Sequence, residues 1–142
     1  PIDYFADRLL SGTSIKPTLL LPSGESPSDW SPSPAVIAGL ASADLIISHG
    51  ADFEPWLKTA TLPKRKVFSP EAGIQWIELA GGTHSHGSGG EHSHVGKDPY
   101  IWSDPLQVSS QVSSLAGRLS FQFPQHKELL EKNLGEYYTR CE

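Results

Sequence analysis

The order of apolar patterns along the chain constrains its fold more than any other feature. Helix-like patterns, with apolar residues three or four positions apart, alternate with short apolar runs that are typical of buried strands. The strand-like runs cover residues 15–22, 44–48 and 66–69, and we expect residues 74–79 to be extended. Such alternation favours an α/β fold with a mainly parallel sheet flanked by helices. In sheets of this kind, ligands bind at the carboxyl ends of the strands.

Signals for the ends of helices support the same organisation. Ser33 and Asp104 are each followed by proline, which is typical of an N-cap and the first helical residue. The helix after Asp104 is expected to bury one apolar stripe, which consists of Leu106, Val108, Val112, Leu115 and Leu119. Pro124 ends this helix and begins another. We therefore expect residues 1–123 to form one α/β lobe and residues 124–142 to begin a further helix.

Length, charge and cysteine content exclude several classes of protein. A chain of 142 residues is long enough for one domain with a single core. Its net charge of −5 argues against a nucleic-acid-binding surface, which needs clustered lysine and arginine. The one cysteine, Cys141, excludes an internal disulfide framework and a Cys-x-x-Cys zinc site. Since the chain has neither a starting methionine nor a signal peptide, we expect it to be part of a longer precursor.

Residues 82–97 form a His-rich segment that is the strongest candidate for chemistry. Two His-x-His pairs, separated by glycine and serine, consist of His84, His86, His92 and His94. Neutral imidazole is the commonest protein ligand for zinc and similar metals. Glycine and serine build no core, so they leave such a segment free to fold around an ion. The pattern predicts a metal site, with Glu91 or water as a further oxygen donor; the alternative is a linker whose histidines cluster by chance.

Two other positions are weaker candidates for metal ligands. His49 follows an apolar strand at its carboxyl end, where it is either a cleft ligand or, as we favour, a hydrogen-bonded structural histidine. Asp29 lies in a loop rich in proline and serine, where its carboxylate either donates an oxygen to a metal or is simply exposed.

Catalytic motifs are missing from the sequence. It contains no His-Glu-x-x-His, no nucleophile elbow and no Gly-rich phosphate loop followed by Lys-Ser or Lys-Thr, so we predict no catalytic residue and no enzyme. Two alternatives stay open. A zinc site with one free coordination position would suit a zinc-dependent hydrolase. An adhesion or interaction module would use the His-rich segment as a low-affinity metal sensor.

A longer pattern of residues resembles a known family. In chain order it consists of Gly24-x-x-Pro27, the Ser33-Pro34 helix start, Ala43-Asp44-Leu45-Ile46-Ile47, Gly50 with Glu54-x-Trp56-Leu57, the His-rich segment, and Asp98-Pro99-Tyr100-Ile101-Trp102-Ser103-Asp104-Pro105. Together these resemble the metal-binding solute-binding proteins of ABC transporters, some of which were first called adhesion lipoproteins. The resemblance covers the N-terminal lobe of that family's two lobes. The final helix resembles the start of the long helix that joins them.

The resemblance implies a function, a location and partners. The chain is expected to capture a transition-metal ion, zinc first and manganese second, in the periplasm or at the cell surface. Delivery to an ABC permease would follow, without enzymatic chemistry or nucleic acid. The signal segment and the C-terminal lobe would lie outside this chain. An isolated lobe, with its cleft face uncovered, could associate with a second copy.

The resemblance breaks down at the two positions that normally supply metal ligands. The family usually has histidine where this chain has Ser28 and Tyr100. Neutral hydroxyl groups are poor zinc ligands compared with imidazole. We favour the explanation that the histidines of residues 82–97 have replaced the lost pair. The alternative is that tight binding has been lost and the His-rich segment acts as a low-affinity collector or sensor.

Overall fold

The computed structural model describes residues 1–79, 83–85, 91–93 and 96–141. It describes the backbone alone for residues 83–85, 91–93 and 141. The helices and strands are, in chain order, α1 (Ile2–Leu9), α2 (Pro34–Leu40), β1 (Ile46–Ile47), β2 (Val67–Phe68), β3 (Glu78–Leu79), β4 (Thr83–Ser85), β5 (Glu91–Ser93), β6 (Gly96–Lys97), α3 (Pro105–Gln122) and α4 (Lys127–Cys141). Short 3-10 helices cover Pro55–Lys58, Lys64–Lys66, Ile101–Ser103 and Pro124–His126.

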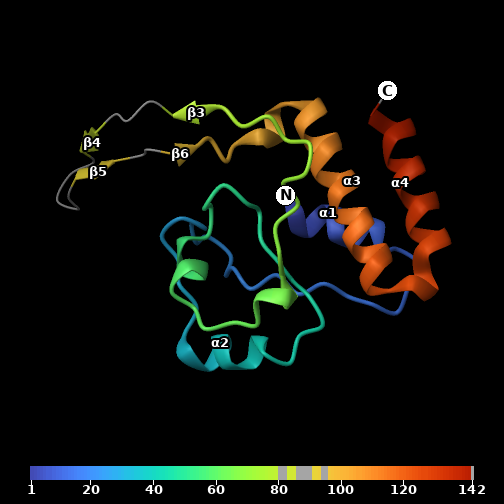
Figure 1. Ribbon diagram of the computed structural model, residues 1–142, viewed down its shortest axis with the longest axis horizontal. Helices are drawn as coiled ribbons and strands as arrows, with labels where there is room; N and C mark the ends of the chain where they lie inside the picture. The colour runs from blue at the N-terminus through green and yellow to red at the C-terminus, as the bar shows by residue number, and fades with distance from the viewer. Residues whose placement is uncertain (80–82, 86–90, 94–95, 142) are drawn as a thin grey trace.

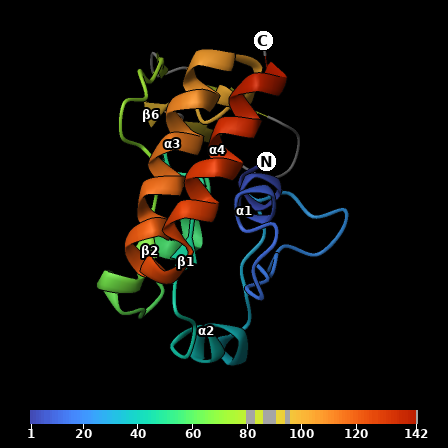
Figure 2. The same ribbon diagram turned by 90° about the vertical axis from the view of Figure 1, so that its right-hand side faces the viewer.

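Three helices enclose the main core. Figure 2 shows α3 and α4 side by side, with α1 beside α4. The buried residues of this core are Phe5, Ala6, Leu9, Leu10, Val108, Val112, Leu115, Ala116, Leu119 and Leu130. The buried residues of α1 and of α3 lie on one face of each helix, as the periodicity predicts. Leu106 is the exception, because 78% of it is exposed and it does not belong to the buried stripe.

The parallel sheet is smaller than the sequence predicts. β1 and β2 pair in parallel, with Ile46 opposite Val67 and Ile47 opposite Phe68. The other two strand pairs of the described residues are antiparallel. The α/β class is confirmed, because helices pack beside a small parallel sheet.

The predicted strand over residues 15–22 is wrong, because none of its residues belongs to a strand in the structure. Pro17 lacks the N–H that a ladder needs. Residues 15–21 instead run beside α1 and β1, where the three segments line a largely apolar cavity of about 570 Å³.

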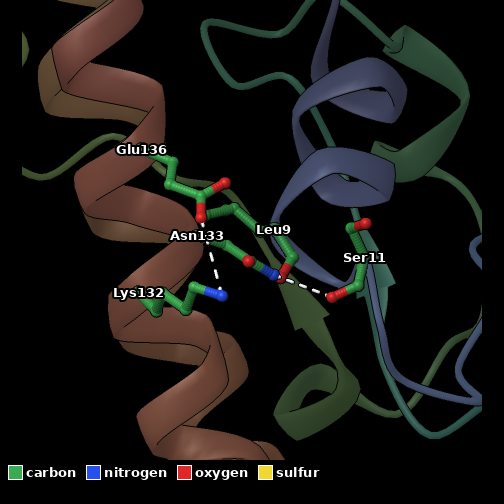
Figure 3. Close-up of polar contacts among 5 residues, drawn as sticks. All are labelled: Leu9, Ser11, Lys132, Asn133 and Glu136. Carbon is green, nitrogen blue, oxygen red and sulfur yellow. Dashed lines mark hydrogen bonds and ion pairs between the residues drawn. The ribbon is translucent and has the colours of Figure 1, made fainter.

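Polar side chains fix the ends of the helices. The Asp104 carboxylate accepts hydrogen bonds from the Leu106 and Gln107 N–H groups, and Ser33 accepts one from Val36, so both predicted N-caps are confirmed. At the C-terminal end of α1, the Asn133 side chain of α4 donates to the carbonyls of Leu9, at 2.8 Å, and Ser11, at 2.9 Å (Figure 3). These two bonds tie α4 to α1.

The last helix packs back on the same core. α3 ends at Gln122, a 3-10 turn covers Pro124–His126, and α4 follows antiparallel to α3 (Figure 1). The Tyr138 hydroxyl of α4 donates to the Ser109 carbonyl of α3 at 3.2 Å. The chain direction therefore reverses near residue 124, and the division into 1–123 and a connecting helix over 124–142 stays a prediction. No helix within the described residues is long and apolar enough to cross a membrane.

Candidate metal-binding site

The described parts of the His-rich segment belong to two antiparallel strand pairs. β3 pairs with β6 so that Glu78 faces Lys97 and Leu79 faces Gly96. Further out, β4 pairs with β5, and both pairs extend away from the helices (Figure 1). Antiparallel strands that are close in sequence form a hairpin, so the candidate site lies on a β-hairpin. Here "hairpin" refers to the four strands β3, β4, β5 and β6.

The register of the hairpin brings one histidine from each His-x-His pair together. His84 of β4 lies directly opposite His92 of β5, and Ser85 lies opposite Glu91. Residues directly opposite each other are the nearest cross-strand neighbours in an antiparallel pair. His86 and His94, the other two predicted ligands, lie outside the described residues. The side chains of His84, His92 and Glu91 also lie outside what the structure describes.

The residue at the first substituted ligand position lies in an exposed turn. Ser28 is exposed, and its hydroxyl lies 2.8 Å from that of Ser26. The backbone carbonyl of Ser26 accepts hydrogen bonds from Asp29 at 3.1 Å and Trp30 at 2.9 Å, which closes the turn. The candidate ligand Asp29 is exposed on the same turn.

The second substituted position belongs to a cluster of aromatic side chains. Tyr100 is 58% exposed, and its backbone N–H donates to the Asp98 carboxylate at 2.9 Å. Its ring makes edge contacts with Phe53 and Trp102, with centroids 5.9 and 5.0 Å apart. Aromatic rings prefer such edge-to-face arrangements. The Tyr100 ring is therefore held by packing.

His49 is buried, and both of its ring nitrogens have hydrogen-bond partners. It is 2% exposed, and Nε2 lies 2.7 Å from the Pro99 carbonyl oxygen. The Gln111 side chain donates to the His49 carbonyl at 3.2 Å and lies 3.4 Å from Nδ1. Burial, the largest effect, lowers the pKa of His49 below its ordinary value of 6.5, so the ring is neutral near pH 7. This arrangement supports the structural interpretation of His49 that the sequence analysis favours.

Two glutamates hold the turn that follows β1. The Glu54 carboxylate accepts the His49 backbone N–H at 3.0 and 3.1 Å, and Glu71 accepts the N–H of Ala51 at 2.9 Å. Burial raises the pKa of Glu54 above its ordinary 4.5. Sequence patterns did not single out Glu71 or Gln111, because each lies 20 or more positions from its partner in the chain.

Among the side chains that the structure describes, no group of three or more His, Cys, Asp or Glu could hold a metal ion. His49 is committed to its hydrogen bonds, and Ser28 and Tyr100 offer only hydroxyl groups. The His-x-His pairs of residues 82–97 stay the predicted donors for a transition metal.

Comparison with known proteins decides the family. The family described as zinc-uptake complex component A, periplasmic (ZnuA) matches residues 1–142. The chain belongs to the ZnuA family. The predicted family resemblance is thus confirmed, and the family's members are binding components of uptake systems and not enzymes.

The relatives that match this chain are longer than it is. Zinc-binding lipoprotein AdcA of Streptococcus pneumoniae is 28% identical over 146 residues, which covers 98% of this chain and 29% of AdcA. High-affinity zinc uptake system protein ZnuA of Bacillus subtilis is 32% identical over 130 residues, covering 87% of this chain and 40% of that protein. The crystal structure of the metal-dependent lipoprotein YcdH from Bacillus subtilis superimposes with a TM-score of 0.76 at 26% identity, over 96% of this chain and 47% of that one. This member of the ZnuA family therefore spans less than half the length of each of these three proteins.

Proposed function

We propose that this chain is the N-terminal lobe of a solute-binding protein that captures a transition-metal ion outside the cytoplasm and delivers it to an ABC permease. Zinc is the first candidate for the cargo and manganese the second. Membership of the ZnuA family supports the transport role, and the two named relatives are described as zinc proteins. A periplasmic or cell-surface location agrees with the family's description and with AdcA being a lipoprotein.

The observation that carries the proposal is the pairing of His84 with His92 across the hairpin. Each belongs to a His-x-His pair, so two further histidines are close in sequence. Four imidazoles are a suitable donor set for the tetrahedral coordination that zinc prefers. We propose that His84, His86, His92 and His94 bind the ion, with Glu91 as an additional oxygen donor.

No covalent bond is made or broken in the proposed mechanism. Neutral imidazoles capture the ion, the two lobes of the full-length protein enclose it, and docking on the permease releases it. Protons compete with the metal for the same ring nitrogens, so affinity should fall as the pH decreases through the histidine range. Ser28 and Tyr100, at the two positions where the family usually has histidine, would supply no imidazole to the ion.

A zinc titration of the full-length protein tests the proposal. Replacing all four hairpin histidines with alanine should reduce zinc affinity at least about tenfold, because the replaced side chains carry the strongest donors. Competition with a chromophoric chelator measures the affinity, and His126→Ala, in the 3-10 turn before α4, is the matched control. An unchanged zinc affinity would show that these four histidines do not bind the ion. Turnover of an ester or peptide that a chelator abolishes would instead favour the hydrolase alternative.

A further inference from the structure

We propose that His49 is a positioning residue for metal capture: it fixes residues 98–100, and with them the base of the hairpin, without touching the ion. The inference rests on the proposed function, because it assigns His49 a part in the same site. It replaces the weaker possibility that His49 is itself a ligand.

The ring of His49 joins two parts of the chain that are far apart in sequence. A carbonyl oxygen can only accept, so the 2.7 Å contact with Pro99 means that Nε2 carries the proton and donates. In this neutral tautomer Nδ1 keeps a lone pair, which faces the Gln111 amide nitrogen at 3.4 Å. Gln111 is 1% exposed on α3 and also donates to the His49 carbonyl. The imidazole therefore links α3 to the segment that follows β6.

The position of the ring is fixed on its other sides as well. Glu54 holds the His49 backbone N–H through both carboxylate oxygens. The ring contacts those of Phe53 and Trp102, with centroids 5.0 and 5.4 Å away. Close packing of this kind leaves a buried ring few alternative rotamers. His49 can therefore act as a fixed donor for the Pro99 carbonyl.

The segment that His49 holds is the return path of the hairpin. Asp98 follows β6 directly and donates its backbone N–H to the Ile77 carbonyl, just before β3, at 2.7 Å. The Asp98 side chain then accepts the N–H of Tyr100. Together with the His49–Pro99 bond, these contacts fix three successive residues at the base of the hairpin. Groups that hydrogen-bond directly to metal ligands change metal affinity ten- to a hundredfold when removed, and we expect a loss in the same direction when the segment next to the ligands is released.

The same contacts argue against His49 as a ligand. A metal needs the lone pair of a ring nitrogen, but Nε2 is protonated and Nδ1 faces Gln111. With 2% of the residue exposed, an ion would have to displace these partners to reach the ring. A positioning role and a ligand role for His49 predict different zinc affinities for the conservative variant His49→Gln.

The test compares His49→Gln with His49→Ala in the full-length protein. A glutamine amide keeps a neutral N–H donor for the Pro99 carbonyl but is a poor zinc ligand. Zinc affinity should fall about tenfold or more in the alanine variant and stay within about threefold of the natural protein in the glutamine variant. Hydrogen exchange of the Asp98 and Tyr100 amides should accelerate in the alanine variant alone. His126→Gln is the matched control and should change neither measurement.

Each outcome bears on the inference. Equal loss of zinc binding in both variants, with the Asp98 and Tyr100 amides still protected, would make His49 a ligand and overturn positioning. Natural affinity in His49→Ala would overturn positioning while the proposed function stands. A natural protein that takes up no zinc would overturn both. Should His49→Ala not fold, Gln111→Ala replaces it, with the same expected loss of affinity and protection.

Discussion

Among single residues, Asn133 joins two helices that are distant in sequence. Its amide donates to the carbonyl of Leu9, a group that the end of α1 leaves without a partner inside the helix, and to the carbonyl of Ser11 in the turn that follows (Figure 3). Asn133→Ala should therefore lower the free energy of unfolding by about 1–2 kcal/mol, as urea denaturation would measure. The neighbouring Lys132 provides a matched control, since its ion pair with Glu136 is exposed at 3.7 Å. Lys132→Ala should cost less than about 0.5 kcal/mol, and equal losses would contradict the assignment.

At the scale of elements, the turn after β1 depends on a left-handed backbone. Gly50 has φ of 97°, and a Cβ built there would lie 2.8 Å from Cγ of Glu71. Gly50→Ala should therefore lower the free energy of unfolding by about 1–3 kcal/mol. Gly117 in the middle of α3 is the matched control, because a Cβ there meets nothing within 4 Å.

The control has the opposite expected sign. Alanine loses less backbone entropy than glycine on forming a helix, so Gly117→Ala should raise the free energy of unfolding by up to about 1 kcal/mol. Thermal unfolding of the two variants measures both effects. If Gly50→Ala were as stable as the natural protein, the turn would not need its left-handed conformation.

At the scale of the whole molecule, the buried His49 and the half-buried Glu54 make stability depend on pH in opposite directions. Burial lowers the pKa of His49 below 6.5, so the unfolded chain takes up this proton first and the fold loses stability as the pH decreases through 6.5. Burial raises the pKa of Glu54 above 4.5, so the folded protein takes up that proton first and gains stability as the pH decreases through the raised value.

The His49 contribution can be isolated by substitution. His49→Gln removes the titrating ring and keeps a neutral donor, so this variant should lose less stability than the natural protein between about pH 7.5 and 5.5. Urea denaturation of both proteins at several pH values within this range measures the difference. Parallel pH profiles would show that His49 does not titrate differently in the folded and unfolded states.

Much of this protein was readable from local sequence, because the deciding contacts are local. The N-caps at Ser33 and Asp104 depend on residues two or three positions away, and the buried face of α3 follows from helical spacing from Val108 onward. The His-x-His pairs identified the donor chemistry, and an ordered set of short motifs identified the family. These features needed no knowledge of how distant segments meet.

Only the tertiary structure decided which residues work together. The segment over 15–22 has the composition of a strand, but a strand exists only with a partner, and this segment lines a cavity instead. His49 looked like a possible ligand until α3 brought Gln111 to it from 62 positions along the chain. The register that sets His84 against His92 belongs to the pairing of two strands, and no pattern within either strand specifies it. Local interactions therefore determined the helix caps and the buried face of α3, while long-range packing and pairing determined which segments form strands and which residues lie together.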